Sequence, residues 1–390
     1  MADITIVHPS LNRGGGAEKV CLAFIEALAS AGYNVRLATI DRTVWKMLEE
    51  RIGKIVRPNR EVYLISSTFT FSLDMLSQAA ASALFPFILL LLKCGREEVL
   101  INTYGDLVDY LADLAYVNAI PVRLSHKVCS GLPNSFTWKA ACHMYNNVVS
   151  SFRSSFRSQL IANSRFIQRI LLKEWGRDSI VIYPPVDIDV FAGMGRKAKR
   201  ENLVVSVSRF RHGKKLDVIP RVARLVEGAE FIIAGISDGA SKAALKDISS
   251  LIKQLRVNDR VRILVNQPFE EYIDVLSSAS LYLHTQPSEA FGISVVEAMA
   301  AGCVPIVPRS GGPWIDILDG VQGLYGFSYS NEAEAANLIK TLINDEGLRR
   351  EVAARASRRS SNFNKLIFER RVLEVVDKVY GAKNRTGIFQ

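Results

Sequence analysis

Residues 287–302 read Pro287-Ser288-Glu289-Ala290-Phe291-Gly292-Ile293-Ser294-Val295-Val296-Glu297-Ala298-Met299-Ala300-Ala301-Gly302 and follow an apolar run, 281–285. This pattern predicts a strand, then a loop carrying Glu289, then a helix that begins near Gly292 and turns Glu297 inward. A helix N-terminus presents free backbone N–H groups and a partial positive charge, so an anion such as phosphate can bind there. Carboxylates on either side can accept hydrogen bonds from hydroxyl groups.

Apolar runs with strand character alternate with helical patterns along the chain, which indicates a doubly wound α/β architecture. With 390 residues, the chain is too long for one ordinary core and suggests two domains. The consecutive prolines in Tyr183-Pro184-Pro185-Val186 and the basic run 196–200 mark the linker. We predict strands at 4–8, 35–40, 99–102, 122–125, 160–162, 203–208, 230–234, 261–265, 281–285 and 304–307, and helices that include 17–31, 332–344, 346–357 and 365–380.

The net charge of +10 is compatible with nucleic acid, an anionic membrane face or phosphorylated substrates. The basic residues are spread over 153–169, 196–200 and 355–371, and no single block has aromatic residues interleaved as a groove for single-stranded nucleic acid would need, so we expect no nucleic-acid partner. A solvated basic surface and a membrane-facing one both remain open. The apolar segment 79–92 is shorter than the roughly 20 residues of a spanning helix and contains Pro86. It fits either a buried core helix or a shallow interfacial segment.

Five scattered cysteines without a C-x-x-C pair indicate neither a disulfide framework nor a zinc site. The N-terminus, residues 1–8, reads as a strand rather than as a basic leader followed by an apolar signal region. We therefore expect a cytoplasmic protein, with peripheral association at the cytosolic face of a membrane as an option.

The stretch 287–302 resembles the donor-site motif of glycosyltransferase family 4, retaining enzymes of the GT-B fold. Phe291-Gly292 after the first acid, Glu297-Ala298-Met299-Ala300 at the second, and the turn Ser310-Gly311-Gly312-Pro313 all follow that pattern. The resemblance implies two Rossmann-like domains facing a cleft. It implies that Glu289 contacts the transferred sugar and that Glu297 accepts hydrogen bonds from the nucleotide ribose. The backbone amides of Phe291, Gly292 and Ile293 would complete the donor pocket.

By the same resemblance, we expect an acceptor-side domain at 1–185, a nucleotide-sugar donor domain at 186–363, and a final helix, 364–390, that crosses back to the first domain. The sequence 206–215, Ser-Val-Ser-Arg-Phe-Arg-His-Gly-Lys-Lys, resembles the Gly-Arg-x-x-x-x-Lys element of the family. Arg209 and Lys214 would then bind the pyrophosphate and stabilise its charge. Ser208 replaces the usual glycine, and the neighbouring Lys215 leaves the choice of lysine open.

A glycine-rich loop, Asn12-Arg13-Gly14-Gly15-Gly16-Ala17-Glu18-Lys19, separates the first predicted strand from the first helix. Glycines allow close approach of the backbone to phosphate, so Gly15 and Gly16 are donor-binding candidates. The loop could also be taken for the dinucleotide-binding motif of a nicotinamide enzyme, with Asp41 as the acid that binds the ribose. That motif requires a third glycine, and this chain has Lys19 at that position. His126, after a predicted strand, resembles the family histidine that faces the reacting sugar, although Lys127-Val128 replaces the usual Tyr-Pro.

Asp187-Ile188-Asp189 has the spacing of a D-x-D metal-binding motif, but it overlaps the family's ordinary Pro-Pro-Val-Asp turn between the domains. We therefore expect no metal and no other cofactor. His8-Pro9, followed by Gly14-Gly15-Gly16-Ala17-Glu18, resembles most closely the mannosyltransferases that extend dolichol-linked oligosaccharides on the cytosolic membrane face. The resemblance implies transfer of mannose from GDP-mannose to a glycolipid such as a polyprenyl-diphosphate-linked oligosaccharide. The alternatives are a UDP-sugar transferase for glucose, galactose or N-acetylglucosamine, and a non-catalytic, basic membrane-associated protein that keeps the fold.

Overall fold

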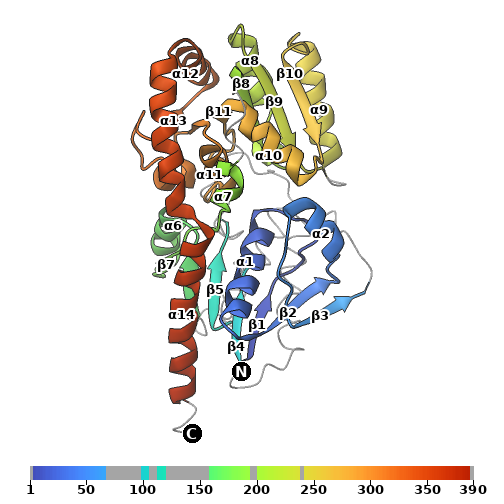
Figure 1. Cartoon of the computed structure of the whole chain (residues 1–390), viewed down its shortest axis with the longest axis vertical. Coiled ribbons are helices and arrows are strands. Elements are labelled where there is room, and N and C mark those ends of the chain that lie inside the picture. Colours follow the sequence, from blue (N-terminus) through green and yellow to red (C-terminus); the bar gives the residue numbers. More distant parts are fainter. Residues whose placement is uncertain are drawn as a thin grey trace. The chain divides into compact units, whose positions relative to one another are not determined.

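A computed structural model describes residues 3–66, 98–104, 112–119, 158–193, 200–237 and 241–386 of the chain. These residues form two compact units, each built around one parallel sheet (Figure 1). Unit 1 comprises Met1–Pro185 and Lys365–Gln390, and unit 2 comprises Val186–Asn364. The chain thus returns to unit 1 after Asn364, one residue later than the predicted end of the second domain at 363. The apolar segment 79–92 lies outside the described residues.

Unit 1 is a Rossmann-like sheet whose described strands are parallel and run in the order β3-β2-β1-β4-β5-β6-β7. Three of them, β3, β5 and β7, were not predicted, and the strand predicted at 122–125 lies outside the described residues. The elements are β1 (Asp3–Val7), α1 (Gly16–Ser30), β2 (Asn34–Asp41), α2 (Trp45–Ile52), β3 (Arg60–Ile65), β4 (Val99–Asn102), β5 (Leu114–Val117), β6 (Gln159–Ala162), α6 (Arg165–Trp175), β7 (Ile180–Val181) and α14 (Lys365–Thr386).

The C-terminal helix α14 completes the core of unit 1. Its Phe368 packs edge-on against Phe24 of α1 at 5.3 Å between ring centroids, and Phe24 packs against Tyr116 of β5 at 5.6 Å. Val372 and Val376, one and two helical turns further along α14, are fully buried in the same cluster. The apolar spacing that predicts a helix at 365–380 therefore also marks the face that covers α1.

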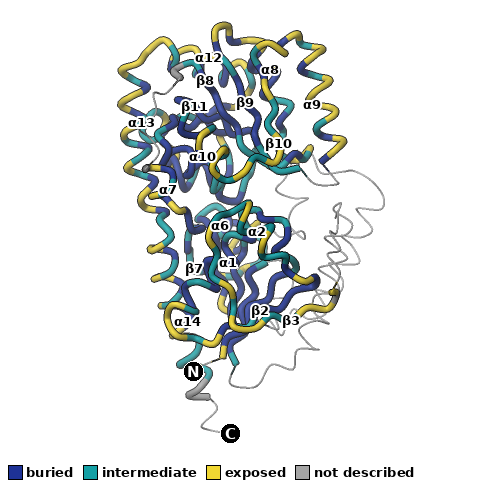
Figure 2. The backbone as a smooth tube through the Cα atoms, turned by 45° about the vertical axis from the view of Figure 1, so that its right-hand side comes forward, coloured by how far each residue is buried: buried dark blue, intermediate teal, exposed yellow. Residues whose placement is uncertain are grey.

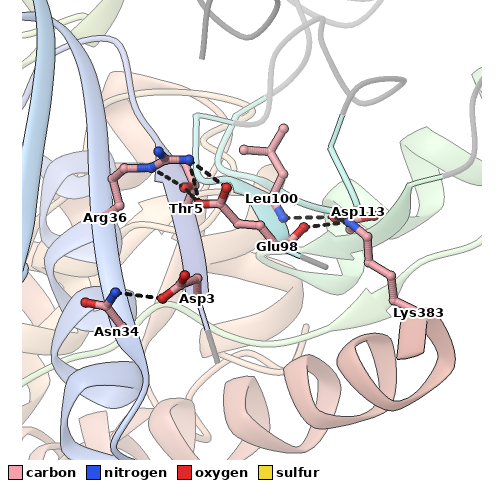
Figure 3. Close-up of polar contacts among 8 residues, drawn as sticks. All are labelled: Asp3, Thr5, Asn34, Arg36, Glu98, Leu100, Asp113 and Lys383. Carbon is pink, nitrogen blue, oxygen red and sulfur yellow. Dashed lines mark hydrogen bonds and ion pairs between the residues drawn. The ribbon is translucent and has the colours of Figure 1, made fainter. Parts of the chain in front are cut away.

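A polar network joins α14 to the end of the sheet where the strands begin (Figure 3). Arg36 of β2 makes a two-pronged contact with Glu98 at 2.6 and 2.7 Å and donates to the Thr5 hydroxyl at 2.7 Å. Lys383 of α14 donates to the Glu98 carbonyl at 2.6 Å and to Asp113 at 2.8 Å. Hydrogen bonds between charged groups are stronger than neutral ones, so the contact between Lys383 and Asp113 helps to hold the end of α14 against the sheet.

Unit 2 is also Rossmann-like, with parallel strands in the order β10-β9-β8-β11-β12-β13. Its strands are mostly buried, whereas the outer faces of helices such as α9 and α13 are exposed (Figure 2). The elements are α7 (Ile188–Gly193), β8 (Arg200–Val207), the 3-10 turn η2 (His212–Lys214), α8 (Val218–Leu225), β9 (Glu230–Gly235), α9 (Lys242–Gln254), β10 (Val261–Val265), α10 (Phe269–Ser278), β11 (Ala279–Leu283), α11 (Ile293–Ala300), β12 (Val304–Pro308), the π-helical turn η4 (Pro313–Ile317), β13 (Phe327–Tyr329), α12 (Glu332–Asn344), α13 (Glu346–Ser360) and the 3-10 turn η5 (Ser361–Phe363).

The prediction of alternating strands and helices is confirmed, with one difference that matters for the site. β11 ends at Leu283 rather than at 285, so His284 and Thr285 belong to the loop that carries Glu289. Among the described helices, none is both long and apolar enough to cross a membrane.

Replacing Phe368 by Ala tests the role of α14 in unit 1. The change removes a buried ring from a close-packed cluster, so it should lower the free energy of unfolding by about 3–5 kcal/mol. The matched control is Leu366→Ala on the same helix, because that side chain is 70% exposed and should change stability by no more than about 0.5 kcal/mol. Urea unfolding measures both, and equal losses in the two variants would contradict the assignment.

Candidate donor site

The order of strands in unit 2 brings two loops to one point. β8 and β11 are neighbours at the middle of the sheet, and the chain leaves them in opposite directions, toward β9 and toward β12. Open parallel sheets bind ligands where such loops diverge beyond the carboxyl ends of the strands. The loop after β8 carries Arg209 and Lys214, and the loop after β11 carries Glu289. The topology therefore brings these predicted site residues together.

Lys214 and Glu289 form an ion pair across the two loops. Lys214 Nζ lies 2.7 Å from Glu289 Oε2, and the Thr285 hydroxyl donates to the Lys214 carbonyl at 2.7 Å, which holds the turn in place. Burial acts to raise the pKa of Glu289, but opposing interactions, above all the charge of Lys214 and the hydrogen bond from its ammonium group, leave that pKa below its ordinary value. Glu289 is therefore ionised at neutral pH and can accept hydrogen bonds.

The adjacent lysines Lys214 and Lys215 occupy different surroundings. Lys214 lines a small pocket together with Ser208 and His284. Lys215, in a left-handed conformation at φ 54°, instead lines a groove that includes Asp247 of α9. Arg209 follows β8 directly and its charge acts on Glu289. The structure thus places Arg209 and Lys214 near Glu289, and places Lys215 on the wall of the second groove.

His284 is a site residue that the sequence reasoning passed over. Its side chain is buried, and its Nε2 lies 3.9 Å from Glu289 Oε2 without a hydrogen-bond partner in the described part of the chain. Burial lowers the pKa of His284 to about 4, so the ring is neutral at physiological pH. Gln286, which lines the same small pocket, also has a buried side-chain oxygen without a partner among the described residues. Unpaired buried polar atoms of this kind are available to a ligand or to water.

Two glycines let the backbone of another loop approach Glu289 closely. Gly312 N–H donates to the Glu289 carbonyl at 2.8 Å. A Cβ atom on Gly311 would lie 2.6 Å from the Glu289 carbonyl oxygen, and one on Gly312 would lie 2.2 Å from that of Ala290. Neither approach is possible for a residue with a side chain, so the Gly311-Gly312 pair fixes the backbone on which the Glu289 side chain stands.

Helix α11 carries the second glutamate. Gly292 is its N-cap at φ +99°, a conformation that favours glycine, and Ile293 is the first helical residue. Phe291 is buried against Phe363, with 5.3 Å between ring centroids, and so anchors the helix start. Glu297 is 4% exposed and its Oε2 accepts a hydrogen bond from the Tyr272 hydroxyl.

The glycine-rich loop of unit 1 is held by polar side chains on either side. Gly15 is the N-cap of α1, and its N–H donates to Glu18 Oε2 at 2.8 Å in a capping box. Asp41, the acid of the rejected nicotinamide fingerprint, accepts hydrogen bonds from Ser10 at 3.0 Å and Asn12 at 2.9 Å. Its observed contacts therefore brace the loop that precedes Gly15 and Gly16.

His8, at the end of β1, also lies beside this loop and had no predicted role. It is fully buried, with Nδ1 3.0 Å from the Thr103 hydroxyl and Nε2 3.9 Å from Glu18 Oε1. Burial alone would lower the pKa of His8, but Cys21 and Glu18 together raise it to about 9. The sequence placed His8 at the end of the first predicted strand and within the His8-Pro9 resemblance, but gave no reason to place it in the site.

Two further predictions concern His126 and the pair Asp187 and Asp189. His126 lies outside the described residues, so its expected role stays a prediction. Asp187 and Asp189 are both exposed at the start of α7. Within the described ranges, no group of three or more His, Cys, Asp or Glu side chains is placed to hold a metal ion.

Solved structures share this architecture. The Anabaena protein HepE, whose structure was solved in complex with UDP and glucose, is 18% identical, with a TM-score of 0.71 over 97% of this chain and all of HepE. Two Rossmann-like units with loops gathered at the strand-order reversal of the second unit, together with this likeness, show the GT-B fold that the sequence predicted.

The sequence comparisons point to glycosyltransferases. Residues 190–359, nearly all of unit 2, match the family model Glycosyl transferases group 1, so this part of the chain is similar to those enzymes. A human protein named GDP-Man:Man(3)GlcNAc(2)-PP-Dol alpha-1,2-mannosyltransferase is 25% identical over 97% of this chain and 87% of its own length. The protein of the same name from Dictyostelium discoideum is 30% identical, but that match spans 45% of this chain and 39% of the relative.

The buried neutral His284 predicts a pH dependence of stability. Its pKa is about 4 in the folded protein and about 6.5 when unfolded, so the unfolded state takes up a proton first as the pH falls. Stability should therefore fall between pH 6.5 and pH 4, and His284→Asn should reduce that fall. Urea unfolding at pH 7, 6 and 5 measures the slope. An unchanged slope in the variant would show that His284 is not a buried neutral histidine.

Proposed function

We propose that the protein transfers mannose from GDP-mannose to a glycolipid acceptor such as a polyprenyl-diphosphate-linked oligosaccharide, with retention of configuration. The observation that carries the proposal is the similarity to the human mannosyltransferase, which spans 97% of this chain and includes the whole Lys214–Glu289 site. The name of that relative specifies a GDP-mannose donor and a dolichol-diphosphate glycan acceptor.

The site supports a mechanism in which the leaving diphosphate is stabilised by protein cations. The bond from the anomeric carbon to the β-phosphate oxygen breaks, and the acceptor oxygen bonds to that carbon on the same face. The acceptor proton passes to the departing β-phosphate. Arg209 and Lys214 would stabilise the charge that develops there, which is usually the largest contribution to catalysis. Because Lys214 is paired with Glu289 in the structure, the donor pyrophosphate would compete with Glu289 for the ammonium group. Glu289 would then be available to the sugar hydroxyls.

A second candidate is a UDP-sugar transferase acting through the same site. It is favoured by the likeness of the fold to HepE, which was solved with UDP and glucose. The two candidates differ in the nucleotide base and the sugar, and they share the pyrophosphate and its cationic partners.

A donor panel tests the proposal. Binding of GDP, GDP-mannose, UDP, UDP-glucose and UDP-N-acetylglucosamine is measured by calorimetry with and without Mg²⁺. We expect binding of the GDP ligands alone, with equal affinity in both conditions, because Arg209 and Lys214 supply the positive charge. A preference for UDP ligands would mean that the donor is a UDP-sugar and would leave the proposed mechanism unchanged. Failure of all five to bind would overturn the proposed function, and loss of binding without Mg²⁺ would overturn the metal-free mechanism.

The two lysines allow a matched test of the phosphate contact. Lys214→Ala should lower kcat/KM by about 10²-fold or more, because it removes a cation from the developing charge. Lys215→Ala should have a smaller effect, since that side chain lines the other groove. The control is Lys246→Ala on the exposed face of α9, which should leave turnover unchanged. A larger loss of kcat/KM in Lys215→Ala than in Lys214→Ala would assign the phosphate contact to Lys215 instead of Lys214.

A further inference from the structure

The two glutamates of the site have partners of different chemistry. Glu289 Oε2 pairs with the Lys214 ammonium group, whereas Glu297 Oε2 accepts a hydrogen bond from the Tyr272 hydroxyl. Tyr272 belongs to α10, the helix that precedes β11, and lies 25 positions before Glu297 in the chain. This contact was not predicted from the sequence, because nothing in the spacing of α10 identifies Tyr272 as a partner of α11.

Tyr272 is held as a fixed neutral donor. Its ring packs edge-on against Phe191 of α7, with 6.0 Å between centroids, and at a tilt against Phe269, one turn earlier on α10, with 6.4 Å between centroids. Burial, reinforced by the charge of Glu297, raises the pKa of Tyr272 well above its ordinary value, so the hydroxyl keeps its proton. A hydrogen bond from a fixed neutral donor to a carboxylate is a strong, directional contact.

The tyrosine on the neighbouring strand has a different task. Tyr282 of β11 donates to the Ser294 hydroxyl at 2.8 Å, in the first turn of α11, and also lies 3.2 Å from the Val207 carbonyl. Tyr282 therefore links the helix start to the sheet. Tyr272 is the tyrosine whose hydroxyl reaches the Glu297 carboxylate.

We propose that Tyr272 is a positioning residue that orients the Glu297 carboxylate toward the ribose hydroxyls of the bound nucleotide; this inference rests on the proposed function. A glutamate side chain has three rotatable bonds, and a carboxylate that must accept hydrogen bonds from a diol gains affinity when its orientation is already set. Tyr272 sets the orientation from α10, on the protein side of the carboxylate. The substrate group affected is the ribose, which lies away from the reacting anomeric carbon.

Tyr272→Phe removes the hydroxyl and keeps the ring. We expect about a tenfold weaker Kd for GDP by calorimetry, because a hydrogen bond to a charged group is lost. The value of KM for the donor should rise by a similar factor while kcat changes less than about threefold, since the ribose contact is the same in the ground state and the transition state. If the donor panel selects uridine, UDP replaces GDP in these measurements.

Deoxynucleotides distinguish positioning from a general loss of structure. In the wild type, 2′-deoxyGDP and 3′-deoxyGDP should bind more weakly than GDP, and in Tyr272→Phe this penalty should shrink severalfold. In a Glu297→Gln background, Tyr272→Phe should have little further effect, because the two residues act through one contact. Equal penalties in wild type and variant, or additive effects of the two substitutions, would overturn the inference.

Tyr116→Phe is the matched control. Tyr116 is a buried tyrosine of unit 1 whose hydroxyl donates to the Ile182 carbonyl at 2.9 Å, so its replacement also removes one tyrosine hydrogen bond. Thermal unfolding should show a loss of stability in both variants, but Tyr116→Phe should leave the Kd for GDP unchanged. If the wild type binds GDP and Tyr272→Phe binds it equally well, only this inference fails. If the wild type binds no nucleotide of the panel, the proposed function fails and the inference fails with it.

Discussion

The reversal of strand order between β8 and β11 is the constraint on which the candidate site depends. Parallel strands all end at the same edge of a sheet, and the chain leaves these two central strands in opposite directions, so their loops meet without a third element between them. This is why Lys214 and Glu289, 75 positions apart, can form a hydrogen bond of 2.7 Å. The close approach of Gly311 and Gly312 to the Glu289 loop then fixes one side of that meeting point.

Electrostatics within the site follow from burial and from the pairing of charges. A buried histidine and a half-buried lysine both lie near one carboxylate oxygen of Glu289. His284 loses its proton because a buried charge is costly, whereas the ion pair with Lys214 keeps Glu289 ionised. The site therefore holds a compensated ion pair beside a neutral ring. A ligand with negative phosphates could exchange for the carboxylate at Lys214 without leaving an unpaired cation.

The sequence predicted the alternation of elements and the residues of the motif, because hydrophobic periodicity and helix-start chemistry are local properties. The helix 332–344 and the strand 261–265 were found with their observed bounds, and Gly292 was identified near the start of α11. The strand β7 was missed because two residues carry too little periodicity. The end of β11 was placed two residues late, and the two residues concerned, His284 and Thr285, are buried in the loop that follows the strand.

The contacts across the site could not be predicted in the same way. His284, Gln286 and Tyr272 reach the site through the packing of elements, and no local pattern distinguishes them from ordinary core residues. His8 is a similar case in unit 1, where two different segments supply its neighbours. The resemblance to a family could supply only the residues of the family's motifs. His284, Gln286, Tyr272 and His8 lie outside those motif assignments and reach their sites through the surrounding fold.

The different partners of the two glutamates suit the different demands that nucleotide-sugar transfer would make on them. A contact to the transferred sugar has to change during the reaction, and Glu289 is paired with a flexible ammonium group that a phosphate can attract away. A contact to the nucleotide has to stay the same throughout, and Glu297 is paired with a neutral hydroxyl packed between aromatic rings. A charged partner at Glu297 would also be drawn toward a bound diphosphate, which would disturb the carboxylate that we propose to hold the ribose. A neutral donor avoids that competition, so the chemistry of Tyr272 is itself an argument for a binding contact that persists from donor entry to release of the nucleotide.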